Sequence, residues 1–203
     1  MNNLSTTAKK LDRIFEIVHI VLGALAIASI VFIVLIGLAY IMKWDPEMIG
    51  TGYASFDIGF LELEVAEAFA PDKWLVLAQA ALTLAVSCRL LYDLRRGVTY
   101  VREILKPMTE EKPFDSIVST NLKKLANLSI TIGILWNVVI LAEQIMMIFV
   151  YDLPGLLLSE KIIHIGGMFK LDLTFVIYWA ILTLLSYVFR YGESLQQLSD
   201  ETL

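Results

Sequence analysis

The chain alternates long apolar runs with shorter polar segments. A bilayer core needs roughly 20 mostly apolar residues per helix, and four runs qualify or come close. They cover residues 14–42, 74–92, 125–151 and 171–191. Strong hydrophobicity in the first run continues through Ile36, so we expect a retained helix there and not a cleaved signal peptide. The pattern predicts an all-α membrane protein whose single integral membrane domain, 1–203, is a four-helix transmembrane bundle.

Composition supports the membrane class. Of 203 residues, 58% are hydrophobic and 18% are charged, with a net charge of −5, whereas soluble domains are about 45–50% apolar and about 25% charged. The single cysteine, Cys88, leaves no disulfide framework and no cysteine-based metal site. The acidic balance gives no support for direct nucleic-acid binding.

The distribution of Lys and Arg predicts the orientation. Twelve of them lie in the N-terminal segment, in and beside the segment between the second and third runs, and in the tail, whereas the other two connecting segments hold four. Basic residues favour the cytoplasmic side. We therefore expect a multi-pass protein of the cell membrane with both termini and segment 93–124 in the cytoplasm, and loops 43–73 and 152–170 outside.

The segments between the runs have patterns of their own. Residues 56–60 and 61–65 alternate as strands do, and short apolar runs flank Gly166-Gly167 as in a hairpin. We expect a small extracytoplasmic cap with β structure, and an ordered loop without a sheet fits as well. On the cytoplasmic side the second helix should continue until Pro107 stops it, and Asp115 should cap the next helix. Together these two helices form a predicted hairpin extension.

The middle and outer part of the third run contains the polar side chains Asn137, Glu143 and Gln144. A carboxylate in the membrane is costly and should face protein or water, or be protonated. One interpretation makes Glu143 a proton- or cation-sensitive site. The other makes it a structural carboxyl that is hydrogen-bonded between helices.

Five apolar residues near the cytoplasmic ends form a predicted docking surface for a partner: Phe114, Ile117, Val118, Leu195 and Leu198. Exposed apolar residues framed by charges often mark such surfaces. The alternative is that the hairpin and the tail cover each other. The basic residues Arg95, Arg96 and Arg102 would attract an acidic partner or anionic lipid.

Two segments resemble a known family. They are 112–125, which contains Lys112-Pro113-Phe114 and Asn121-Leu122-Lys123-Lys124-Leu125, and 189–203, which begins Phe189-Arg190-Tyr191-Gly192-Glu193. Together they resemble the bacterial four-helix membrane proteins called Domain of Unknown Function 2975. Members often have Gly where this chain has Lys112. The resemblance implies a bacterial inner-membrane protein, often encoded beside a small helix-turn-helix regulator, with no catalytic residue to carry over.

These observations favour a non-enzymatic regulator or sensor that binds a cytoplasmic partner such as a small DNA-binding regulator. No Walker loop, zinc motif or nucleophile elbow is present in the sequence, and we expect no cofactor and no metal. Two alternatives stay open: a small transporter or channel-like protein that uses Glu143, and a membrane immunity or stress protein. Small-residue stripes on the first two runs also allow a homo-oligomer.

Overall fold

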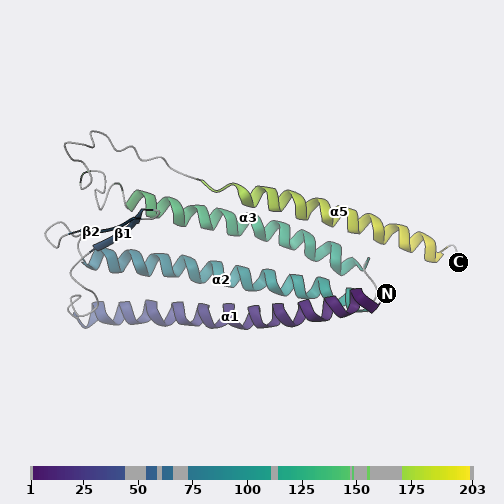
Figure 1. Cartoon of the computed structure of the whole chain (residues 1–203), viewed down its shortest axis with the longest axis horizontal. Helices are drawn as coiled ribbons and strands as arrows, with labels where there is room; N and C mark the ends of the chain where they lie inside the picture. The colour runs from purple at the N-terminus through teal and green to yellow at the C-terminus, as the bar shows by residue number, and fades with distance from the viewer. Residues whose placement is uncertain are drawn as a thin grey trace. The chain divides into compact units, whose positions relative to one another are not determined.

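The computed structural model describes residues 2–43, 54–58, 61–65, 73–110, 114–146, 148, 155 and 171–201. These contain four long helices and two strands, labelled in Figure 1: α1 (Asn2–Ile41), β1 (Ala54–Ile58), β2 (Leu61–Val65), α2 (Lys73–Thr109), α3 (Ser116–Ile145) and α5 (Thr174–Glu201). Each of the four helices is long and apolar enough to cross a membrane. These helices confirm the predicted all-α class with four candidate membrane spans, which is what a multi-pass membrane protein requires.

The helix ends agree only in part with those predicted from the sequence. The prediction that Pro107 stops the second helix is wrong, because α2 continues to Thr109, with Glu110 N donating to Pro107 O at 3.0 Å. Proline lacks an N–H, but its φ fits a helix, so the chain can complete a turn beyond it. The cap at Asp115 is confirmed. Its Oδ1 accepts a 2.8 Å hydrogen bond from Ile117 N at the start of α3.

The two strands form an antiparallel hairpin. Phe56 pairs with Leu63, and Ile58 with Leu61, so apolar positions lie opposite apolar positions. The strands therefore pair with each other inside the first predicted loop. The second predicted hairpin, around Gly166-Gly167, lies outside the described residues. The role of β1 and β2 as an extracytoplasmic cap stays a prediction.

The chain divides into two compact units. The first comprises Met1–Ala28, Cys88–Asn137 and Asp172–Leu203, and the second comprises Ser29–Ser87 and Val138–Leu171. In the first unit, Ile104 of α2 and Val118 and Leu122 of α3 form a buried cluster. Leu182 and Phe189 of α5 pack against it, so three helices share this core. In the second unit, Tyr40 of α1 meets Trp74 of α2 edge-on, with ring centroids 5.2 Å apart.

Within the first unit, α5 packs antiparallel to α3. Ser186 Oγ donates to Ser119 O at 2.8 Å, and both residues are buried. Farther along, Phe175 lies directly over Gly133, where a Cβ would overlap the Phe175 side chain. Small residues let membrane helices approach this closely. Gly133 is therefore the contact point that fixes the separation of α3 and α5.

We predict that Gly133→Ala lowers the thermal stability of the protein in mild detergent. The new methyl group meets the base of the Phe175 side chain, which cannot swing away cheaply, and overpacking of this kind costs about 1–3 kcal/mol. Gly37→Ala is the matched control, because nothing lies within 4 Å of the Cβ position there. Equal melting temperatures for the two variants would contradict the close packing.

Candidate functional site

Polar contacts join α1 to α2 in the first unit at a regular interval. Successive contacts are seven residues apart on both helices: Arg102 Nε donates to Asp12 Oδ1 at 2.8 Å, Arg95 Nε donates to His19 Nε2 at 2.8 Å, and Cys88 Sγ lies 3.9 Å from Ala26 O. A seven-residue repeat is the signature of helices that pack as a coiled coil. We call this row of contacts the α1–α2 seam. It fixes the antiparallel register of the two helices.

The centre of the seam is the Arg95–His19 pair. Gly23 lies against this pair, since a Cβ there would be 3.4 Å from Arg95 Cζ. The other ring nitrogen, His19 Nδ1, is buried and has no hydrogen-bond partner among the described residues. The Arg95 hydrogen bond at Nε2 is therefore the contact that holds the His19 ring in the seam.

A fully buried carboxylate, Asp93, lies on α2 close to this seam in the sequence. Its side chain is 0% exposed, and Oδ2 accepts a 3.0 Å hydrogen bond from Arg89 Nε. Arg96 Nη1 lies 3.8 Å from Oδ1, and Oδ1 has no hydrogen bond from the described residues. Asp93 was not among the residues predicted from the sequence. The available signal was the spacing of Arg89 and Arg96, four residues before and three after, which places all three on one helix face.

Aromatic rings surround the two arginines that pair with Asp93. Arg89 and Arg96 lie over the Tyr92 ring, with Cζ 5.6 Å and 5.9 Å from its centroid. Arg96 also donates to Tyr100 Oη at 3.1 Å. Lys124 of α3 lies over the Tyr100 ring at 5.4 Å. Cations over aromatic faces are attracted to the ring quadrupole, so the Lys124–Tyr100 contact connects α2 to α3.

The three predicted basic residues all have partners within the chain. Arg102 binds Asp12 and lies 3.8 Å from Glu16, Arg95 binds His19, and Arg96 binds Tyr100 near Asp93. Arg95 and Arg96 are nevertheless exposed, and Arg102 is half-buried. Their attraction for an acidic partner or anionic lipid stays a prediction.

The three polar residues of the third span do not form one site. Asn137 belongs to the first unit, whereas Glu143 and Gln144 belong to the second. Asn137 is buried, and it donates to Asp172 O while accepting from Asp172 N, both at 2.8 Å. It therefore ties the start of α5 to α3 and has a structural role. Gln144 is half-buried, and Glu143 is exposed.

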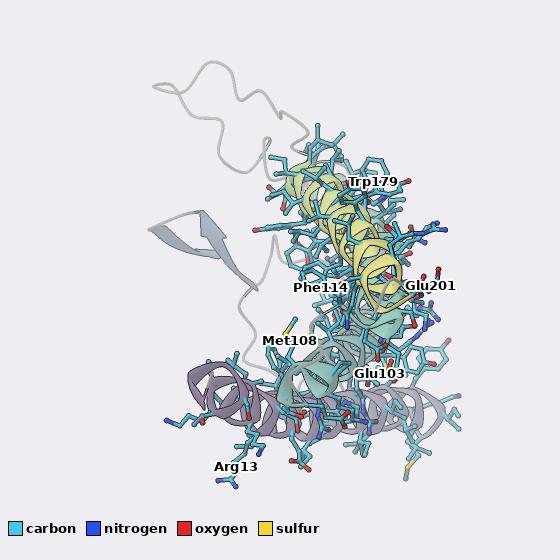
Figure 2. All side chains as sticks on the ribbon, turned by 90° about the vertical axis from the view of Figure 1, so that its right-hand side faces the viewer. Arg13, Glu103, Met108, Phe114, Trp179 and Glu201 are labelled. Carbon is cyan, nitrogen blue, oxygen red and sulfur yellow. The ribbon has the colours of Figure 1, made fainter. Side chains whose placement is uncertain are left out.

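The five predicted docking residues also differ in their burial and contacts. Val118 is 0% exposed inside the core, so its assignment to a docking surface is wrong: the apolar stripe of α3 turns this residue toward α2. Phe114, labelled beside α5 in Figure 2, stacks at 5.9 Å on Phe189 and covers Gly192. The hairpin and α5 do cover each other at Phe114. Four of the five remain exposed, Phe114 among them despite its contacts: Phe114, Ile117, Leu195 and Leu198.

A cavity of about 520 Å³ opens beside Ile117 where α2 ends and α3 begins. Its lining is mostly polar and includes Glu103, which is labelled in Figure 2. Glu103 Oε2 accepts a 2.9 Å hydrogen bond from Asn121 Nδ2, and Lys124 Nζ donates to Asn121 Oδ1 at 3.2 Å. The described part of the chain holds no group of three His, Cys, Asp or Glu side chains that could bind a metal ion.

Comparisons with protein family models, with curated proteins and with solved structures found no match. The resemblance to Domain of Unknown Function 2975 therefore stays a prediction from the segments that suggested it. The function has to be argued from the geometry of this chain.

We predict that Arg89→Gln lowers the free energy of unfolding in mild detergent by about 1–3 kcal/mol, because it leaves the buried Asp93 carboxylate poorly paired. Adding Asp93→Asn should recover most of the loss, since the amide carries no charge. The control is Arg190→Gln, which removes an exposed arginine from α5. A similar loss in the control, or no recovery in the double variant, would show that the Arg89–Asp93 pair does not stabilise the fold.

Proposed function

We propose that this protein is a multi-pass membrane protein of the bacterial inner membrane that holds a cytoplasmic protein partner. The observation that carries the proposal is the exposed end of α5. Leu195 and Leu198 are 49% and 60% exposed, and they stand in the polar stretch that follows Gly192. Contact with lipid acyl chains does not explain the exposure of these two leucines, because the residues around them in the sequence are mostly polar or charged.

These leucines lie beyond the part of α5 that packs against α3 and the residues just before it. Phe114, next to the start of α3, packs over Gly192, and α5 continues from there to Glu201. Ile117, 48% exposed, lies within one turn of Phe114 and lines the polar cavity. Leucines and an isoleucine framed by polar groups offer an apolar anchor with a polar rim, which is the usual anatomy of a protein interface.

The proposed orientation of the protein in the membrane rests on its basic residues. Twelve of the sixteen Lys and Arg belong to the segments that we assign to the cytoplasm. Both termini and the α2–α3 connection then lie in the cytoplasm, and β1 and β2 form an extracytoplasmic cap. The partner class comes from the resemblance alone, which implies a small helix-turn-helix regulator. Exposed apolar side chains in a polar surrounding suit the apolar face of an amphipathic helix of such a protein.

The alternative is a small transporter or channel-like protein that uses Glu143. A cavity lined by Glu143 favours this alternative, and the cavity lies in the second unit. No observation on the described residues favours the third alternative, an immunity or stress protein.

We predict that Leu195→Asp combined with Leu198→Asp releases the partner from the membrane fraction. Burying two leucines stabilises a complex by about 1.5–3 kcal/mol each, so the affinity should fall at least tenfold. The assay co-expresses the chain with a small helix-turn-helix regulator of the kind that the resemblance implies, and it measures the regulator in membrane and soluble fractions. Gln196→Asp combined with Gln197→Asp is the control, because it adds the same charge to the same turn.

Membrane insertion of the protein itself should be unchanged in both double variants. If the regulator stays in the soluble fraction with the unaltered protein, or if both double variants release it equally, the docking proposal fails. The alternative based on Glu143 would then take its place.

A further inference from the structure

The second unit contains a cavity of about 280 Å³ between α2 and α3. Its walls are mainly apolar, formed by Leu75, Ala78, Leu82 and Val86 of α2 and by Val138, Val139, Ala142 and Met146 beside them in α3 and just after it. Three lining residues are polar: Gln79, Thr83 and Glu143. Among the described residues that line the cavity, Glu143 is the charged one. The described walls thus combine apolar side chains with a single carboxylate.

The charge of Glu143 lacks compensation within the described part of the chain. The residues there give its side chain neither an ion pair nor a hydrogen bond, and the described lining residues include no Lys or Arg. Glu143 lies within a helix that is long and apolar enough to cross a membrane. A carboxylate at such a depth is costly unless a proton or a cation neutralises it. Asp93 shows the contrast, because two arginines surround it.

The chemistry of the walls defines the class of ligand. One carboxylate with an amide and a hydroxyl is too poor a set of oxygen ligands for a divalent cation, which prefers several carboxylates or waters. An anion would be repelled. A ligand with an apolar body and one positive charge satisfies both parts of the site. The volume lies just below the range typical of drug-sized ligands, so the ligand must be compact.

We propose that this cavity binds a compact lipophilic monocation, such as an aryl-substituted ammonium ion, through an ion pair with Glu143. The bound cation neutralises the carboxylate, and its apolar body fills the space between α2 and α3. The site does not require the cytoplasmic partner, so either proposal can fail without the other. It deepens the Glu143 alternative by naming the ligand class, and it requires binding but not transport.

The first test uses the full chain in lipid nanodiscs and radiolabelled benzyltrimethylammonium as the probe. Equilibrium binding should be saturable, and Glu143→Gln should weaken it at least tenfold. Glu193→Gln, which removes the same charge from α5 in the first unit, should bind as the unaltered protein does. Equal binding by the Glu143→Gln variant and the unaltered protein would overturn the proposal.

The second test needs no variant and so does not depend on folding of one. Dicyclohexylcarbodiimide modifies carboxyl groups in apolar surroundings, and mass spectrometry of the unaltered protein reports labelling at Glu143. Benzyltrimethylammonium should protect Glu143, whereas its neutral isostere neopentylbenzene should not. Equal protection by both compounds would mean an apolar pocket that takes a lipid chain. The proposal would also be overturned if neither compound protected Glu143. The same holds if cross-linked dimers showed that a second copy of the chain shields Glu143.

Discussion

A polar group that is buried between packed helices has no water to bind, so it must find its partner on the protein. This constraint explains the contacts that hold the first unit together. Asp93 takes its charge compensation from Arg89 on the same helix. Asn137 binds the backbone of Asp172, and Ser186 binds Ser119. Each such contact also joins or stiffens helices, so the polar residues determine which helix faces pack together.

The same constraint gives the α1–α2 seam its importance. Apolar side chains of α1 are exposed along most of its length, as expected for contact with lipid acyl chains, and apolar surface carries little information about register in lipid. The pairs Asp12–Arg102 and His19–Arg95 supply that information, because a shift of one helix by a single turn would separate both.

Local features could be predicted from the sequence, and features that depend on helix register could not. Apolar runs predicted the four helices, and Asp115 was recognisable as a cap because capping needs only adjacent residues. Val118 was assigned to the surface because a stripe does not say which neighbour will cover it. Asp93 was missed because a carboxylate between arginines looks like a solvated surface until the facing helix buries it. Glu143 could be located, but its cavity depends on how α2 meets α3.

The central claim is that the helices cross the membrane with the α2–α3 connection in the cytoplasm. Cysteine accessibility tests it most directly, in a Cys88→Ser background that removes the natural thiol. We expect Glu64→Cys, in β2, to react with a membrane-impermeant maleimide on intact spheroplasts, and Glu110→Cys to react only after the membrane is opened. Labelling of both positions, or of Glu110→Cys alone, in intact spheroplasts would contradict the account.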